Sequence, residues 1–286
     1  MIININDDFN LYKISNSGQC FRVRSLDEHT FRFITGMNTL DIRALTDSSD
    51  GGFFEISCSE NEWCSVWSEY FDLNTKYKNI RSEISSDDTF LLNASEIGTG
   101  IRILKQDRFE MLISFIISQR KSIPAIKSSI EKICKLFGIL IPGTDVYSFP
   151  TPQALSSATV DELSSCGLGY RTPYVLEAAV KTATGEFDPE AVSALSDEVL
   201  VATLKTLRGV GSKVADCVAL FGYHRIARAP VDTWIAKIIE EIYNGVSPFG
   251  KYNGYAGIMQ QYMFYAAQHK KILKQTNSSD SGGRNE

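Results

Sequence analysis

A lysine and an aspartate stand where two helical patterns begin. Lys213 follows Gly209-Val210-Gly211 and opens the pattern SKVADCVALF, and Asp232 follows Ala229-Pro230-Val231 and opens TWIAKIIEEIY. A lysine in the first turn of a helix faces the positive end of the helix dipole. This disfavours its ammonium form and leaves an amine that can act as a nucleophile. A lysine that merely reaches for solvent or phosphate fits the position equally well.

Asp232 is placed to cap the helix that it opens. Capping does not preclude chemistry, because a carboxylate fixed by helix amides stays ionised and stabilises a cation that develops on a neighbouring sugar ring. A nucleophilic amine and a fixed carboxylate together suit cleavage of a glycosidic bond through an oxocarbenium-like state, with the amine collecting the sugar as a Schiff base.

The segment between Lys213 and the helix that precedes it is typical of a hairpin. One helix is expected to run to about Leu207, the glycines reverse the chain, and Ser212 is expected to cap the next helix. Two glycines allow close approach of another backbone, and unpaired amides at a helix N-terminus suit a phosphate. An ordinary tight connection between helices is the alternative for so short a glycine pattern.

Charge and composition place an anionic partner on the second part of the chain. The net charge is -5, but residues 1–100 carry 8 basic and 16 acidic side chains, and residues 101–286 carry 21 basic and 18 acidic ones. The chain has 43% hydrophobic residues and no apolar run of membrane-spanning length. Its start lacks the pattern of a secretion signal, which predicts a cytoplasmic location. The six cysteines show no CxxC spacing, which argues against a disulfide framework or a zinc site.

Residue periodicity predicts an α+β fold of two domains. From Leu11 to about Cys58, alternating segments predict short antiparallel strands, and NEWCSVWSEYF predicts a helix packed by its aromatic stripe. From Arg108 onward the period is helical, with TPQALSSATVDELSSCG expected as one of the helices. We therefore expect a sheet domain over 1–95, a helical domain over 96–274 with a hairpin near 199–222, and a disordered tail over 275–286.

Five segments in order resemble the helix-hairpin-helix (HhH-GPD) DNA glycosylases, and among them the 8-oxoguanine DNA glycosylase/AP lyases. LRGVGSKVADC is similar to the family hairpin with its catalytic lysine, and APVDTW to the segment with its aspartate. GQCFRVR resembles an amino-terminal strand motif, CGLGYRTPYV the intercalating loop, and YAGIMQQYMFYA the last pocket helix. The resemblance implies a TBP-like antiparallel sheet domain packed on the helical domain, with the site between them.

The resemblance implies a role for each matching residue. Lys213 would be the nucleophile and Asp232 the essential carboxylate. The Gly18 carbonyl would accept the ring N–H that 8-oxoguanine has and guanine lacks. Phe264 and Cys217 would sandwich the flipped base, and Gln260 would read its Watson-Crick edge. DNA contacts are implied for Gln119, Arg120, Tyr170, Arg171, Gly209, Val210, Gly211 and Trp234, with Tyr170 and Arg171 around the vacated partner.

Without the resemblance, the base-pocket residues have simpler interpretations. Gly18 would be a turn glycine, and Cys217 a small core residue one turn from Lys213. Phe264 would be a core residue and Gln260 a surface one, since they lie four residues apart on one helix face.

The chain also departs from the family pattern. Arg120 and Ala125 stand where animal and fungal members carry an asparagine and an arginine that grip the orphaned cytosine. This favours a bacterial-like branch with relaxed preference for the opposite base. Arg208 replaces a proline common in the hairpin, a change expected to be tolerated, and Trp234 replaces a histidine of the animal enzymes.

Missing features separate neighbouring families. No cysteine follows Cys217, so we expect no iron-sulfur cluster and no other cofactor. Alkylpurine glycosylases lack the hairpin lysine, so Lys213 favours a bifunctional glycosylase and lyase. No metal site built from side chains is expected; the resemblance implies that an ion can bind to carbonyls of the hairpin, as in the family. The expected partner is double-stranded DNA with oxidised guanine, bound by a monomer; an alkylpurine glycosylase and a non-catalytic DNA-binding module remain the alternatives.

Overall fold

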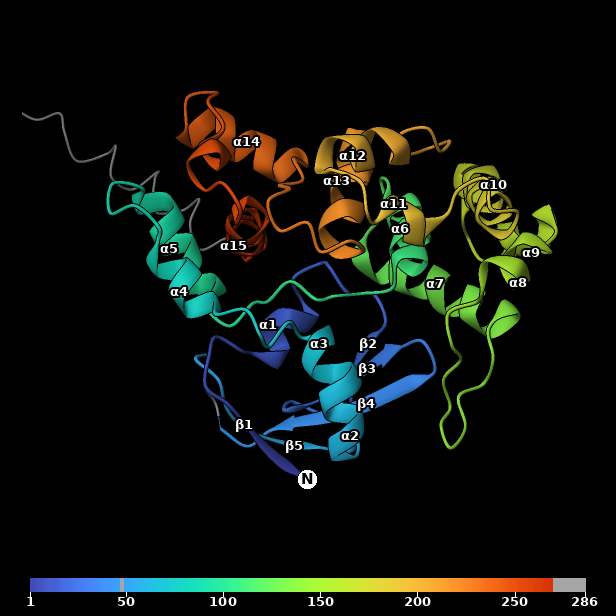
Figure 1. Cartoon of the computed structure of the whole chain (residues 1–286), viewed down its shortest axis with the longest axis horizontal. Helices are drawn as coiled ribbons and strands as arrows, with labels where there is room; N and C mark the ends of the chain where they lie inside the picture. The colour runs from blue at the N-terminus through green and yellow to red at the C-terminus, as the bar shows by residue number, and fades with distance from the viewer. Residues whose placement is uncertain (47–48, 270–286) are drawn as a thin grey trace, which may run out of the picture.

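The amino-terminal part of the chain folds as an antiparallel sheet. The computed structural model describes residues 1–46 and 49–269. The sheet has five strands in the order β1-β5-β4-β3-β2, and each neighbouring pair is antiparallel. The strands are β1 (Ile2–Ile5), β2 (Val23–Ser25), β3 (Thr30–Thr35), β4 (Asn38–Ala44) and β5 (Gly52–Ile56). Figure 1 shows the sheet below most of the helices, which confirms the predicted α+β fold.

The central hairpin of the sheet follows from residue alternation. Phe31 and Phe33 of β3 and Leu40 and Ile42 of β4 are buried, each separated from the next by a more exposed residue. Gly36 takes a positive φ of 53° in the connection, where side chains other than glycine are disfavoured. The alternation therefore fixes which face of the hairpin packs inward.

Two elements of this half differ from the expectation. Residues 11–15 form helix α1 (Leu11–Ser15) instead of a strand, because the Asn10 side chain accepts a hydrogen bond from Lys13 N at 3.0 Å and caps the helix. Strand β1 was not expected, and it pairs with β5 at the edge of the sheet.

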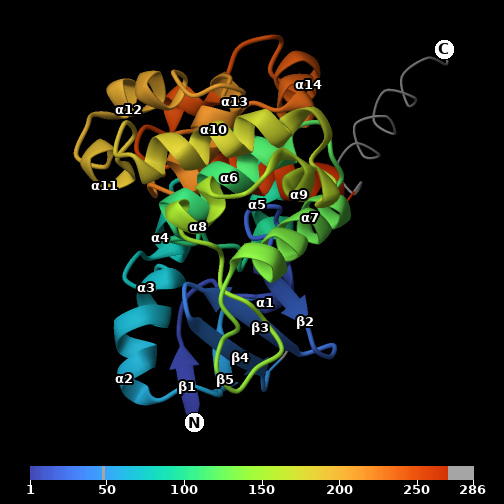
Figure 2. The same ribbon diagram turned by 90° about the vertical axis from the view of Figure 1, so that its right-hand side faces the viewer.

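A helical segment with a π-helical centre covers the sheet. It comprises α2 (Glu60–Glu62), a π-helical turn (Trp63–Trp67) and α3 (Ser68–Tyr70), and Figure 2 shows α2 and α3 beside the strands. Trp67 and Phe71 are fully buried, and Phe71 packs edge-on against Phe33 of the sheet. The predicted aromatic stripe is therefore confirmed as a packing face.

Helices form the rest of the described chain. They are α4 (Tyr77–Ser82), α5 (Thr89–Gly98), α6 (Arg108–Ser118), α7 (Ile123–Phe137), α8 (Pro152–Ser156), α9 (Val160–Ser165), a 3-10 turn (Gly169–Arg171), α10 (Thr172–Ala183), α11 (Pro189–Val192), α12 (Asp197–Leu204), α13 (Ser212–Phe221), α14 (Thr233–Ile242), a 3-10 turn (Pro248–Lys251) and α15 (Ala256–Gln268). No helix of residues 1–46 and 49–269 is long and apolar enough to cross a membrane.

Local contacts refine the expected boundaries. The boundary expected at residue 95 falls inside α5, and Gly98 of this helix lies so close to α15 that an added Cβ would be 2.6 Å from Tyr262 Cδ1. The stretch expected as one helix from Thr151 is two helices, because a capping box between Thr159 and Glu162 starts α9 anew. The tail over 275–286 lies outside the described residues.

Two buried arginines join the sheet domain to the helical domain. Arg102, fully buried, donates to Asp7 Oδ2 at 3.0 Å and to the Phe71 and Thr75 carbonyls at 2.9 and 2.7 Å. Arg22 Nη1 lies 3.9 Å from Oε2 of Glu110 in α6. Buried charges persist only with such partners, so the two domains are fixed to each other by these contacts.

Glu110 gives the fold a specific pH dependence. Burial raises the pKa of its carboxyl to about 7 from an ordinary 4.5, and the Arg22 guanidinium lowers it only in part. An acid with a higher pKa in the folded chain contributes stability that is fully present below about pH 4.5 and is lost as the pH rises through about 7. We expect the free energy of unfolding of Glu110→Gln, measured by urea titration from pH 4 to 8, to lack this component. The same slope in both proteins would contradict the assignment.

Candidate active site

Lys213 lies in the first turn of α13, at the end of the hairpin. The N-cap of this helix is Gly211, with no side-chain cap hydrogen bond, and Ser212 is the first helical residue. The expectation that Ser212 caps the helix is therefore wrong, since the helix begins one residue earlier. The preceding helix α12 also ends earlier than expected, at Leu204. A helix start without a side-chain cap leaves amides available for an anionic ligand.

Asp232 is the N-cap of α14. Its Oδ1 accepts a hydrogen bond from Ile235 N at 2.9 Å, which confirms the predicted cap. The segment before it is tied to α13, because Arg228 donates to Asp216 Oδ1 at 2.6 Å. It is also close to α15, where a Cβ on Gly257 would lie 2.5 Å from the Arg228 carbonyl oxygen. The position of Asp232 relative to Lys213 is thus set by helices on both sides.

One pocket contains every residue predicted for catalysis and base recognition. It has a volume of about 50 Å³ and includes Lys213 and Asp232. Its lining residues are Gly18, Phe115, Lys213, Cys217, Phe221, Pro230, Asp232, Gln260, Gln261 and Phe264. This volume holds only a few water molecules, so a flipped base must displace lining side chains as it enters.

The same two residues also line a wider groove of about 440 Å³ next to this base pocket. Its lining residues are Ser118, Gln119, Arg120, Lys213, Val231, Asp232, Thr233 and Ala236. Lys213 and Asp232 therefore stand at the junction between a narrow pocket and an open groove. A nucleotide whose base enters the pocket would leave its sugar at this junction.

Lys213 is the pocket residue predicted to act as the nucleophile, and this role stays a prediction. Its Nζ lies 5.5 Å from the centroid of the Phe115 ring, which stacks on Phe221. Burial raises the pKa of the neighbouring Cys217 thiol to about 11, although Lys213 lowers it in part. Cys217 is therefore a neutral thiol near pH 7, and a thiol is a poor nucleophile.

Two adjacent glutamines of α15 are buried at the pocket. Gln261 Nε2 donates to Gln260 Oε1 at 3.2 Å, and each residue is 3% exposed. This bond orients the Gln260 amide. The burial of Gln260 rules out the surface position that its sequence alone suggests. Gln261, Phe115 and Phe221 were missed by the sequence interpretation, because nothing in their spacing separates them from core residues.

Gly18 brings the sheet domain into the pocket. It has a φ of 76°, and an added Cβ would lie 3.0 Å from Phe264 Cε1. Gly18 and Phe264 come from opposite ends of the sequence, so the pocket is formed between the two domains, as expected. A methyl group at this position would therefore have to shift the Phe264 ring.

We expect Gly18→Ala to slow base release by about tenfold to a hundredfold, because the methyl group displaces the Phe264 ring inside the pocket. Strain at positive φ also costs about 1–2 kcal/mol of unfolding free energy. Gly185→Ala is the matched control, since Gly185 has a φ of 77° with nothing within 4 Å of an added Cβ. Equal rates for the two variants in single-turnover excision would contradict a base-pocket role for Gly18.

The residues predicted to face DNA differ in exposure. Tyr170 and Trp234 are 52% and 39% exposed, and Arg120 is exposed with a φ of 49°. Arg171 is buried, and it donates to the Gln119 carbonyl oxygen and, at 3.2 Å, to the Leu168 carbonyl oxygen. A direct contact between Arg171 and DNA stays a prediction and requires the side chain to leave these partners.

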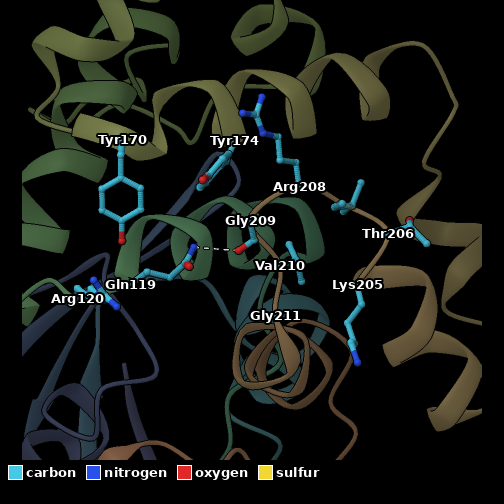
Figure 3. Close-up of a pocket in the computed structure, with 11 residues that line it drawn as sticks. Gln119, Arg120, Tyr170, Tyr174, Lys205, Thr206, Arg208, Gly209, Val210 and Gly211 are labelled. Atoms are coloured by element: carbon cyan, nitrogen blue, oxygen red, sulfur yellow. Dashed lines mark hydrogen bonds between the residues drawn. The ribbon is translucent and has the colours of Figure 1, made fainter.

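The hairpin borders a polar groove of about 730 Å³ (Figure 3). Gly209 and Gly211 line it by their backbone, and the buried Val210 side chain points to the core, so that only its backbone is available to DNA. The Gly209 carbonyl accepts a hydrogen bond from Gln119, and the Leu207 carbonyl accepts one from Val210. Each carbonyl keeps a second lone pair, so an ion at the hairpin stays a prediction.

Comparisons with known proteins agree with this geometry. Residues 1–112 match the N-terminal domain of 8-oxoguanine DNA glycosylase, and residues 113–247 match the HhH-GPD superfamily of base excision DNA repair proteins. An N-glycosylase/DNA lyase of Saccharomyces cerevisiae is 34% identical over 194 residues, 61% of this chain, and the match spans half of the yeast protein. A probable N-glycosylase/DNA lyase of Methanothermobacter thermautotrophicus is 30% identical over 65% of this chain and 70% of its own length.

A solved structure extends the similarity to nearly the whole chain. It is that of the Clostridium acetobutylicum 8-oxoguanine glycosylase/lyase, in complex with double-stranded DNA that contains cytosine opposite 8-oxoguanine. It is 34% identical, with a TM-score of 0.85 over 94% of this chain and 98% of that one. The resemblance drawn from the sequence is therefore confirmed, and the chain belongs to the 8-oxoguanine DNA glycosylase family of the HhH-GPD superfamily.

Proposed function

We propose that this chain is a base excision repair enzyme that removes 8-oxoguanine from duplex DNA and then cleaves the strand as a lyase. The observation that carries the proposal is the junction of the narrow pocket with the open groove at Lys213 and Asp232. The pocket takes the flipped base, and the groove takes the strand that carries it. Family membership and the names of the relatives support the same activity.

The Lys213 amine attacks the sugar carbon that bears the base. The glycosidic bond breaks as the new carbon–nitrogen bond forms, and the base leaves with the bonding electrons and takes up a proton. Asp232 stabilises the positive charge that develops on the sugar. Ring opening gives a Schiff base on Lys213, loss of a C2′ proton expels the 3′ phosphate, and water releases the enzyme.

Base recognition rests on groups that line the pocket. The Gly18 carbonyl accepts a hydrogen bond from the N–H that distinguishes 8-oxoguanine from guanine. Guanine has an acceptor at this position, so its binding would leave two acceptors facing each other in a dry site. Gln260, oriented by Gln261, reads the Watson-Crick edge, and Phe264 and Cys217 contact the base faces.

Other parts of the activity follow from residues of this chain. We propose that it acts as a monomer, without an iron-sulfur cluster or another cofactor. Arg120 and Ala125 leave the opposite base weakly specified, so excision opposite all four bases is expected at similar rates. Trp234, exposed in the first turn of α14, contacts the DNA backbone.

The test is release of free base from duplexes that contain 8-oxoguanine, guanine or an alkylated purine, each opposite the four bases in turn. Release of 8-oxoguanine alone, with strand cleavage, is the expected result. Release of the alkylated purine alone would identify an alkylpurine glycosylase of the same fold. Tight binding of all duplexes without release of any base would identify a non-catalytic module.

A further inference from the structure

The short segment between α6 and α7, residues 119–121, contacts two other segments that border the groove at the hairpin. Its first contact is with the hairpin. Gln119 Nε2 donates to the Gly209 carbonyl at 3.0 Å (Figure 3). It also donates to the Ile116 carbonyl at 2.9 Å. Both hydrogens of the amide are thereby used, so the nitrogen has no proton left to donate to DNA.

The same segment holds the loop that carries Tyr170. Lys121 Nζ donates to the Gly167 carbonyl at 2.7 Å and to Ser129 Oγ at 2.5 Å. At the other end of the loop, the buried Arg171 guanidinium donates to the Gln119 carbonyl. Two cationic groups therefore fix both ends of this loop to residues 119–121, and hydrogen bonds from charged donors are stronger than neutral ones.

Ring contacts connect the loop of Tyr170 directly to the hairpin. Tyr170 packs edge-on against Tyr174, with ring centroids 6.2 Å apart. Gly209 lies against Tyr174, since an added Cβ would be 2.4 Å from its Cδ2. The Arg171 guanidinium lies 4.3 Å from the centroid of the Tyr170 ring. All three segments border the groove of about 730 Å³ at the hairpin.

Arg120, between the two anchoring residues, has a strained backbone. Its φ of 49° is uncommon for a residue other than glycine. Such a conformation persists when the surrounding structure fixes it, and here bonds from Gln119 and Lys121 fix both sides. The strain thus indicates a segment held in place by its neighbours instead of by its own preference.

We propose that Gln119 and Lys121 are positioning residues that couple the hairpin to the loop of Tyr170, so that phosphate binding at the hairpin and insertion of Tyr170 into the duplex reinforce each other. The proposal rests on the proposed function, because it assigns both events to the recognition of a flipped nucleotide. It also assigns the Gln119 amide a role in the protein instead of a DNA contact. Side chains locked in this way reduce the cost of ordering the site on binding.

A double-mutant cycle measures this coupling directly. The full chain carrying Lys213→Gln, which leaves the duplex uncut, is titrated with an 8-oxoguanine duplex as the parent, Tyr170→Ala, Gly211→Ala and the double variant. Gly211→Ala adds a methyl group with nothing within 4 Å in the protein, so it obstructs only an approaching phosphate. If the two sites were independent, the double variant would lose affinity by the product of the two single losses. We expect its loss of affinity to be about fivefold smaller than that product.

The cycle is repeated with Gln119→Met and with Lys121→Met, where the fivefold factor is expected to fall to about one. Gln153→Met and Lys132→Met are matched controls, since both residues are exposed and Lys132→Met removes the same charge. Thermal unfolding reports whether each variant folds, and the Gln119 arm alone decides the outcome if Lys121→Met does not fold. A factor near one in the parent, or an unchanged factor in folded Gln119→Met, would overturn the proposal.

Excision by the unmodified chain separates this result from the proposed function. Excision of 8-oxoguanine without coupling would overturn the positioning role and keep the enzyme. Coupling without excision of 8-oxoguanine would keep the positioning role and overturn the proposed function.

Discussion

Lys213→Gln is expected to lose base excision and strand cleavage together, by about three orders of magnitude or more. Glutamine is one atom shorter than lysine and has no nucleophilic amine, and the buried Cys217 thiol beside it cannot substitute for the amine. The change is measured as the single-turnover rate of cleavage of an 8-oxoguanine duplex. Binding of the duplex should weaken only slightly, because the hairpin amides remain.

Lys135→Gln, on the exposed face of α7, is the control for the loss of one positive charge. It should cleave at the rate of the unmodified chain. Residual excision by Lys213→Gln at more than about a tenth of that rate would mean that water, and not the lysine, attacks the sugar.

Asp232→Asn is expected to reduce excision by about a hundredfold to ten-thousandfold with little change in thermal stability. Asparagine caps helices about as well as aspartate, so the bond from Ile235 N at 2.9 Å survives. The negative charge that stabilises the developing cation is lost. Single-turnover kinetics measures the excision rate, and thermal unfolding of the same preparation measures the stability.

Asp232→Ala separates the two functions of this residue. It removes the cap as well as the charge, and should cost about 1 kcal/mol of unfolding free energy in addition to the rate. Excision by Asp232→Asn at the unmodified rate would reduce Asp232 to a structural cap.

Much of the site could be predicted because its residues lie at local spacings. Lys213 and Cys217 are one turn apart on α13, and Gln260 and Phe264 are one turn apart on α15, so each pair shares a helix face. The roles of these residues came from the family resemblance and not from the spacing. Gly18 in particular reads as a turn glycine until the fold brings it against Phe264.

The contacts that position the site could not be predicted, because they join segments distant in sequence. The bond from Gln119 to Gly209 and the bond from Lys121 to Gly167 have no local signature. The burial of Arg171 by tertiary contacts has no local signature either, and its contact with DNA stays a prediction. The start of α13 also differs by one residue from the prediction, because Gly211 and Ser212 are both residue types that cap helices and Gly211 is the cap.

The central claim is that Lys213 forms a covalent bond with the sugar of an 8-oxoguanine nucleotide. Borohydride reduction of the protein with a duplex that carries one 8-oxoguanine, followed by peptide mass mapping, tests it most directly. We predict a trapped adduct on the peptide that contains Lys213, formed in similar yield opposite all four bases and absent from Lys213→Gln. An adduct on another residue, or none with any opposite base while the duplex is bound, would contradict the account.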